Sequence, residues 1–227
     1  MARIGIIDLQ GGVVEHLAHL ERLGVSAVRV KEPADLNNLA GLIIPGGESS
    51  CLTRLFRRYG LDRAIRARFA AGLKVWGTCA GAILVAKRVD GEPAHLALMD
   101  IDIRRNAFGS QLDSFDIEVE IPAVSERPLP LIFIRAPRIT RLGEGVHSLL
   151  NLDCGGGKGK ENAALRTYCA AAEDAQTLVT IFHPELTPNS AFHGYFCRKC
   201  GVETDKTATQ KMADWKWNSW TRLAGIP

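Results

Sequence analysis

The chain of 227 residues is 46% hydrophobic and 23% charged, which is the balance of a globular protein with a sizeable core. Its formal net charge of +3 is too small to indicate nucleic-acid binding, and no apolar run reaches the roughly 18 residues that a membrane helix needs. The first residues lack the features of a secretory signal, so we expect a cytoplasmic protein whose six cysteines are reduced.

The first half of the chain alternates strand-like runs with segments of helical periodicity. Strands are predicted at residues 4–9, 26–30, 42–44 and 73–76. One helix is predicted from the spacing of Val13, Leu17, Leu20 and Leu23, and another over 49–68 with a break near Gly60. This rhythm predicts an α/β domain of three layers, with a mostly parallel central sheet and helices on both faces.

The second half lacks long helices between its strand-like runs. Such runs occur at residues 100–104, 115–121 and 131–134, and they predict a small antiparallel addition to the same domain. A further buried strand is predicted at 178–182, and a helix begins at Ala191. Because neither a repeat nor a clear linker interrupts the chain, residues 1–227 are expected to form one domain.

Cys79 lies in the run Gly77-Thr78-Cys79-Ala80-Gly81, between a strand-like segment and a small-residue helix pattern. Gly-x-Cys-x-Gly is the thiol counterpart of the nucleophile elbow, in which glycines make room for a sharply turned nucleophile. The N-terminus of the following helix would favour the thiolate. The motif predicts Cys79 as a nucleophile, and the alternative is a buried structural cysteine.

A cysteine nucleophile needs a base, and the base needs an orienting group. His183 directly follows a predicted strand, so His183 and Cys79 are expected at the same carboxyl edge of the sheet. Glu185 follows two residues later and can hold the imidazole. The alternative for His183 is a structural histidine near a loop. His16 and His19 fall on a predicted helix and are expected at its surface.

Acyl chemistry also needs donors for a developing oxyanion. The run Gly46-Gly47-Glu48-Ser49 follows the third predicted strand and opens a helix. Glycines at such a point let backbone N–H groups approach a substrate closely. The alternative is an ordinary turn between a strand and a helix.

Three other patterns are weaker evidence for a functional site. Cys197 and Cys200 have C-x-x-C spacing near His193. A structural zinc site has four ligands, and the sequence has no second pair at suitable spacing, so a zinc site is not expected. The glycine- and lysine-rich segment 154–161 lacks the spacing of a phosphate loop, so a surface loop is expected. The tryptophans of the C-terminal tail are expected to pack against the domain or a partner rather than nucleic acid.

Several longer motifs together resemble the class I glutamine amidotransferases. More narrowly, they resemble the glutaminase subunits of pyridoxal 5'-phosphate synthase, the PdxT/Pdx2/SNO family. The matches run in order from about residue 3 to residue 197. They are Leu9-Gln10-Gly11, Gly41–Ser49, Trp76–Gly81, Arg105–Gly109, Gln111, Asp113-Ser114-Phe115, Phe133–Pro137 and Phe182–Thr187.

The resemblance implies a flavodoxin-like fold and a catalytic triad of Cys79, His183 and Glu185. It also implies a set of residues that contact glutamine and its oxyanion, namely Gly46, Gly47, Glu48, Ser49, Arg105, Ile134 and Arg135. Gln10 and Gly11 are expected to form a loop whose state depends on the partner. The implied reaction is hydrolysis of L-glutamine to L-glutamate and ammonia, which passes to a PdxS/Pdx1-like synthase subunit. The family implies no metal, cofactor, nucleic acid or membrane.

The chain departs from the family pattern in three places. Ser50-Cys51 stands where the family usually has two threonines, residues 151–177 look like an insertion, and residues 201–227 look like a C-terminal extension. Two other functional hypotheses are compatible with the sequence. One is a cysteine hydrolase or chaperone-like protein of the same superfamily, and the other is a silent binding module that regulates a synthase.

Overall fold

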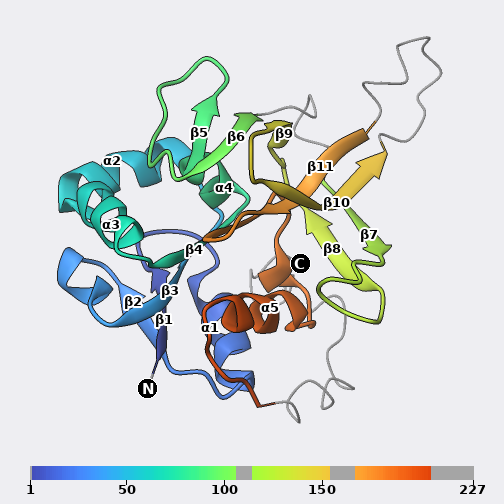
Figure 1. The fold of residues 1–227 in the computed structure, drawn as a ribbon, viewed down its shortest axis with the longest axis horizontal. Coiled ribbons are helices and arrows are strands. Elements are labelled where there is room, and N and C mark those ends of the chain that lie inside the picture. Colours follow the sequence, from blue (N-terminus) through green and yellow to red (C-terminus); the bar gives the residue numbers. More distant parts are fainter. Residues whose placement is uncertain (1, 106–113, 154–166, 206–227) are drawn as a thin grey trace, which may run out of the picture.

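The computed structural model describes residues 2–105, 114–153 and 167–205. A ten-stranded sheet has the order β2-β1-β3-β4-β12-β11-β9-β6-β5, with β10 paired to β11 (Figure 1). Its parallel part consists of β2 (Ala27–Val30), β1 (Arg3–Ile7), β3 (Leu39–Ile44), β4 (Lys74–Thr78) and β12 (Thr177–Thr180). The α/β class and the parallel strands predicted for the first half are confirmed.

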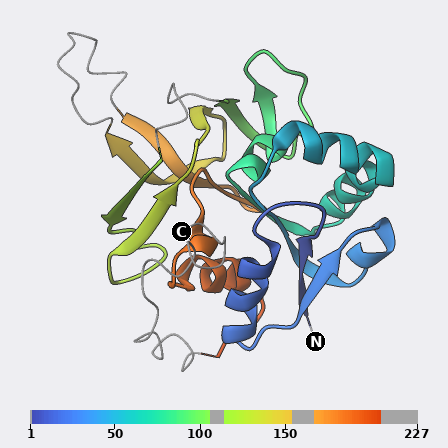
Figure 2. The same cartoon turned by 180° about the vertical axis from the view of Figure 1, so that it is seen from behind.

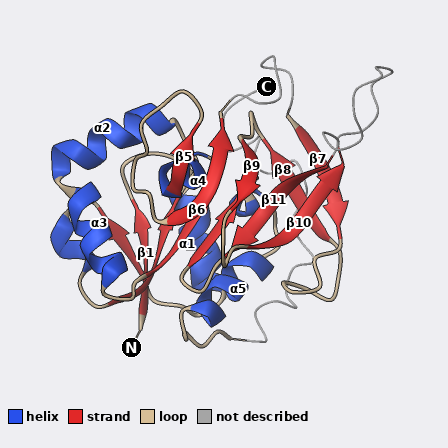
Figure 3. Cartoon of the chain, turned by 45° about the horizontal axis from the view of Figure 1, so that its top comes forward, coloured by secondary structure: helices blue, strands red, loops and turns tan. Residues whose placement is uncertain are grey.

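Helices cover both sides of the parallel strands (Figure 3). They are α1 (Val13–Arg22), α2 (Ser49–Tyr59), α3 (Leu61–Ala70), α4 (Ala80–Val85) and α5 (Ala191–Lys199), with 3-10 turns η1 (Pro33–Leu36) and η3 (Pro184–Leu186). The predicted break falls at Gly60, whose φ of 69° ends α2 in the left-handed conformation that glycine adopts without strain. None of the helices in the described ranges is long and apolar enough to cross a membrane.

The antiparallel part is larger than predicted. β11 (Thr167–Glu173) joins β12 to β9 (Arg138–Leu142), and β6 (Met99–Arg104) pairs antiparallel with β9. At the edge of the same sheet, β5 (Ala86–Val89) pairs parallel with β6. A separate two-stranded sheet pairs β7 (Phe115–Val119) with β8 (Leu129–Phe133). This sheet is the small antiparallel addition that was predicted, and further antiparallel pairs extend the central sheet itself.

The segment 151–177, predicted as an insertion, contains regular parts of that sheet. β10 (His147–Asp153) ends inside it, β11 lies wholly within it, and β12 begins at its last residue. β11 pairs with β9, β10 and β12, so its residues belong to the fold. Residues 154–166 lie outside the described residues, and the insertion stays a prediction for them, as the extension does for 206–227.

The central parallel strands end at one edge of the sheet. Strand β4 pairs Gly77 with Ile44 of β3 and Thr78 with Thr180 of β12. Fully buried side chains such as Trp76 and Phe182 pack beside this edge, and burying a large apolar side chain stabilises a fold by roughly 1.5–3 kcal/mol. The segments that leave this edge carry the predicted triad and the loop at Gly46–Ser49, whereas Arg105 follows β6 and Ile134 and Arg135 follow β8.

Candidate active site

Cys79 occupies a strained turn between β4 and α4. Its backbone has φ 48° and ψ −105°, a conformation that a non-glycine residue rarely adopts. The flanking glycine is required, because a Cβ on Gly81 would lie 2.0 Å from the carbonyl oxygen of Ile44. The amide of Cys79 donates to the carbonyl of Thr180, 2.8 Å away, which ties the turn to β12. The structure therefore has the elbow that the motif predicted.

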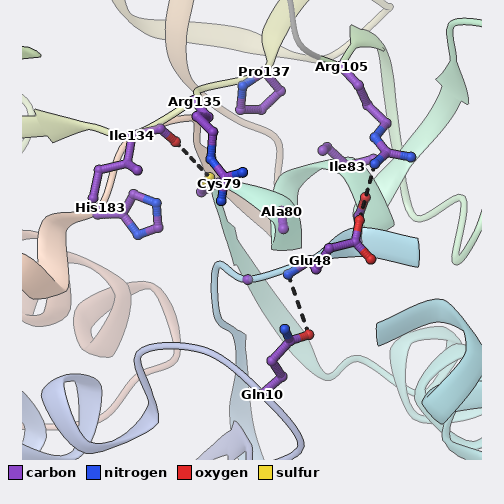
Figure 4. Close-up of a pocket in the computed structure, with 12 residues that line it drawn as sticks. Gln10, Glu48, Cys79, Ala80, Ile83, Arg105, Ile134, Arg135, Pro137 and His183 are labelled. Atoms are coloured by element: carbon purple, nitrogen blue, oxygen red, sulfur yellow. Dashed lines mark hydrogen bonds and ion pairs between the residues drawn. The ribbon is translucent and has the colours of Figure 1, made fainter. Parts of the chain in front are cut away.

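His183 lies beside Cys79 at the end of β12 (Figure 4). Its amide donates to the carbonyl of Ile132 in β8 at 2.8 Å, so the small sheet helps to place it. Its Nδ1 is 2.7 Å from Oε1 of Glu185, which leaves Nε2 as the ring nitrogen available to the sulfur. Burial lowers the pKa of His183, but the charges of Glu185 and Cys79 and the hydrogen bonds to both raise it well above its ordinary 6.5.

Glu185 is 2% exposed and lies behind the imidazole, away from the pocket. Burial raises the pKa of its carboxyl group, but His183 and then His16 lower it, and the net pKa is about 2. The carboxyl group is therefore ionised at neutral pH. Cys79 comes from the turn before α4, whereas His183 and Glu185 come from the segment that follows β12, and the arrangement can support a thiolate beside an imidazolium.

A pocket of about 500 Å³ opens above Cys79. Most of the predicted substrate contacts line it, together with three residues that sequence reasoning did not select. The lining residues are Gln10, Gly47, Glu48, Ser49, Cys79, Ala80, Ile83, Arg105, Ile134, Arg135, Pro137 and His183 (Figure 4). Ala80 and Pro137 were quoted within motifs, and Ile83 lies four residues after Cys79, one helical turn along.

Charged residues are paired at the mouth of this pocket. The guanidinium of Arg105 is 3.2 Å from Oε1 of Glu48 and also bonds Glu92. The carboxylate of Glu48 caps α2 by accepting from Ser50 and Cys51. Hydrogen bonding to Ser50 is the largest of the effects that lower the pKa of Glu48. The Ser50-Cys51 departure therefore still supplies the donors that hold this carboxylate.

Arg135 and Ile134 lie on the loop that follows β8. Arg135 has a φ of 45°, a second strained backbone at this site. Within the described residues no ion pair is formed by its guanidinium, which lines the pocket. The carbonyl oxygen of Ile134 is 3.9 Å from the sulfur of Cys79. The loop thus brings one cation and one acceptor to the same cavity.

Gly46 supports the site from behind and does not line the pocket. Its N–H donates to the hydroxyl of Thr78 at 3.0 Å, so it is not free to bind an oxyanion in this conformation. Gly11 packs so closely that a Cβ there would lie 1.8 Å from the carbonyl oxygen of Gly46. The side-chain oxygen of Gln10 accepts from the amide of Glu48 at 3.4 Å. The predicted Gln10–Gly11 loop therefore contacts the 46–48 loop directly.

Gly46→Ala is expected to lower kcat/KM for glutamine by about 100-fold, because small displacements of catalytic groups are that costly. The added Cβ would lie 2.4 Å from Cε1 of His183 and 3.2 Å from Cβ of Cys79. Steady-state kinetics and thermal unfolding would measure the effect. Gly194→Ala is the control, since its nearest neighbour would be 3.7 Å away. Wild-type kinetics in Gly46→Ala would contradict the placement of His183.

Three buried histidines were missed by sequence reasoning. His16 and His19, predicted at a helix surface, are 0% and 2% exposed, and His193 is 0% exposed. The surface prediction is wrong, because α1 turns His16, His19 and Leu20 towards α5 and η3. A usable signal existed, since Val13, His16 and Leu20 are spaced as one helical face. His193 bonds His16 at 2.8 Å instead of joining the C-x-x-C pair.

Comparison with solved structures places this arrangement in a known class. A crystal structure of a glutamine amidotransferase matches with a TM-score of 0.75 and 35% identity, over 88% of this chain and 99% of that chain. The PurLQS structure from Thermotoga maritima, at 12% identity and a TM-score of 0.58, shows a similar fold alone. The fold is that of a glutamine amidotransferase.

The chain belongs to the SNO glutamine amidotransferase family, whose profile matches residues 6–202. It is 52% identical over 223 residues to the pyridoxal 5'-phosphate synthase subunit PdxT of Syntrophus aciditrophicus, covering 97% of this chain and 94% of that protein. It is 43% identical to the PdxT subunit of Clostridium botulinum, covering 88% of this chain and 97% of that protein. The family expected from the motifs is confirmed.

Proposed function

We propose that this chain, as the glutaminase subunit of a pyridoxal 5'-phosphate synthase, hydrolyses L-glutamine at Cys79 and delivers the ammonia to a synthase subunit. The observation that carries the proposal is the hydrogen-bonded pair of His183 and Glu185 beside a cysteine in a strained elbow. The family match and the PdxT relatives support the same reaction.

In the first half of the reaction, the Cys79 thiolate attacks the side-chain amide carbon of glutamine. The C–S bond forms and the carbonyl oxygen takes the negative charge. His183, protonated on Nε2, then donates this proton to the amide nitrogen, the C–N bond breaks, and ammonia leaves. Its raised pKa keeps the imidazolium available for this transfer.

In the second half, water hydrolyses the glutamyl thioester. Neutral His183 accepts a proton from the water as the oxygen attacks the thioester carbon, and the thiolate leaves as glutamate is released. Glu185 stays ionised throughout, because its pKa is about 2. It stabilises the imidazolium that forms in each half and keeps the ring in one orientation.

The charged residues of the pocket suit the amino-acid end of glutamine. Arg135 is a fixed cation suited to the α-carboxylate, and Glu48 with Arg105 presents charges of both signs at the mouth. Gly47, Ser49 and Ile134 complete the contacts. The N–H of Gly47 is the proposed oxyanion donor, since that of Gly46 bonds Thr78.

The remaining features of the proposal concern the whole protein. One flavodoxin-like three-layer domain spans the chain, functions in the cytoplasm without cofactor or metal, and docks to a PdxS/Pdx1-like synthase subunit. Direct transfer of ammonia suits the chemistry, because ammonia in water near neutral pH is mostly protonated and then not nucleophilic. The Gln10–Gly11 loop lies against the 46–48 loop and is proposed to respond to docking.

The test measures ammonia release from glutamine by the chain alone and with its synthase subunit. Release is expected to increase with the partner, and isotope-labelled amide nitrogen is expected in pyridoxal phosphate. An electrophilic glutamine analogue should modify Cys79, as peptide mass spectrometry can establish. A chain that is neither labelled nor active in the complete complex would be a silent binding module. Hydrolysis of other amides in preference to glutamine would indicate a different cysteine hydrolase.

A further inference from the structure

A cluster of buried histidines lies directly behind Glu185. Two members, His16 and His19, come from α1, and the third, His193, comes from α5. These helices lie side by side in both views of the fold (Figures 1 and 2). The rings of His19 and His193 stack with centroids 4.2 Å apart, and His16 and His193 both make T-shaped contacts with Trp76. The proposed mechanism does not use these three side chains.

The two carboxylate oxygens of Glu185 have different surroundings. Oε1 accepts from His183 at 2.7 Å. Oε2 is 3.6 Å from Nε2 of His16. Both of these atoms are buried and have no hydrogen-bond partner among the described residues. A buried carboxylate oxygen without a donor is costly, so the geometry favours pairing of Oε2 with Nε2 of His16.

The contact between His16 and His193 decides which ring nitrogen of His16 carries the proton. Nδ1 of His16 is 2.8 Å from Nε2 of His193, so one of the two nitrogens donates and the other accepts. If Nδ1 of His16 donated, Nε2 would carry no proton, and its lone pair would face the negatively charged carboxylate of Glu185. This arrangement is repulsive. With the proton on Nε2, His16 presents a donor to Glu185 and accepts from His193.

We propose that neutral His16 is a positioning residue for the glutaminase reaction, its Nε2–H directed at Oε2 of Glu185 and its Nδ1 held by His193. The inference rests on the proposed function. At 3.6 Å the contact is longer than a hydrogen bond, but catalytic hydrogen bonds often tighten only in the substrate complex. Closure would fix the carboxylate so that Oε1 stays aligned with Nδ1 of His183.

Burial of the three rings favours a neutral His16. Burial lowers the pKa of His16, partly offset by Glu185, and His183 lowers it further. Burial lowers the pKa of His193 well below its ordinary value, with additional lowering by His19, His16 and Arg22. Burial also lowers the pKa of His19 to about 4. His19 is held separately, by Ser190 and by the carbonyl oxygen of Glu185.

The test replaces His16 in the complete synthase complex. His16→Leu is expected to lower kcat about ten-fold, the lower range for residues that orient a functional group, with KM changed less than about two-fold. The alkaline limb of kcat should move to lower pH, because a misaligned carboxylate no longer holds the imidazolium of His183. His16→Gln keeps an N–H near the position of Nε2 and should restore most of kcat and the pH profile.

A matched control separates positioning from loss of packing. Phe196→Leu also removes volume from the fully buried layer of α5 against Trp76, and it has no role in the mechanism. It should lower the unfolding temperature without moving the pH profile. Equal changes of kcat and pH profile in both variants, or equal impairment of His16→Gln and His16→Leu, would overturn the inference.

A second measurement does not depend on any variant folding. Nitrogen NMR of the wild-type chain should show His16 neutral with its proton on Nε2, and a proton on Nδ1 would overturn the assignment. A wild-type complex without glutaminase activity would instead refute the proposed function. An active wild type with an unchanged His16→Leu profile would refute only the role of His16.

Discussion

Cys79→Ala is expected to lower glutamine hydrolysis by at least about 10⁴-fold in the complete synthase complex, because loss of a catalytic nucleophile typically has effects of this size or larger. Alanine keeps the turn and removes only the sulfur. Synthesis of pyridoxal phosphate should survive when ammonia is supplied directly, because only its source is lost. Activity would be followed as ammonia release and, in parallel, as product formed with glutamine or with ammonium salt.

Cys169→Ala is the matched control for this experiment. Its thiol is also buried, but it lies in β11 and bonds Ser148, away from the pocket. This variant is expected to retain the glutaminase activity of the wild type. Substantial ammonia release by Cys79→Ala would mean that the elbow cysteine is structural. A loss of both glutamine-dependent and ammonia-dependent synthesis would point to failed docking instead.

Glu185→Gln is expected to lower kcat on the order of 10³–10⁴-fold while KM changes little, as when the orienting acid of a comparable triad becomes an amide. The amide keeps the shape but removes the charge that raises the pKa of His183. The charge of Glu185 is the largest of the effects that raise the pKa of His183, so this pKa falls when the charge is removed. The alkaline limb of kcat should therefore move to lower pH. Pre-steady-state formation of the thioester would report the step affected.

The same substitution should alter the pH dependence of stability. Glu185 has a pKa of about 2 against an ordinary 4.5, so its contribution is present above pH 4.5 and is lost as the pH falls through about 2. The pKa of His183 is raised, so its contribution is complete below pH 6.5 and is lost as the pH rises through the raised value.

Both contributions are therefore present between pH 4.5 and pH 6.5. In this window Glu185→Gln should lower the free energy of unfolding by about 1–3 kcal/mol, the cost of leaving a buried hydrogen-bonding group poorly paired. The difference should shrink at alkaline pH, where His183 is neutral in both proteins. Urea unfolding across the pH range would measure it, and a difference that does not change with pH would contradict the ion pair.

Local signals in the sequence predicted the elements that carry the site. The Gly-x-Cys-x-Gly motif predicted the elbow because only glycine fits where Gly81 approaches Ile44. Gly60 predicted the break between α2 and α3, because it ends the helix with a positive φ. His183 followed a predicted strand, and parallel strands bring their carboxyl ends to one edge. These predictions depend on residues that are close in sequence, or on the rule that parallel strands share one carboxyl edge.

β11 shows where such signals fail. Its sequence, Thr167–Glu173, contains three successive alanines, which have low β-propensity and favour helices. The segment is a strand because β9, β10 and β12 supply its hydrogen bonds and their side chains bury its alanines. Tertiary context overrides propensity in this segment, so its own residues did not predict the strand.

The sequence alone determined the α/β class, the nucleophile elbow, the histidine and carboxylate that follow β12, and through its motifs the family. Only the tertiary structure decided how far the sheet extends, that Arg105 pairs with Glu48, and that His16, His19 and His193 stand buried behind Glu185. The reason is physical. Turn chemistry and periodicity act between residues close along the chain, whereas burial and pairing depend on segments that only the packed fold brings together.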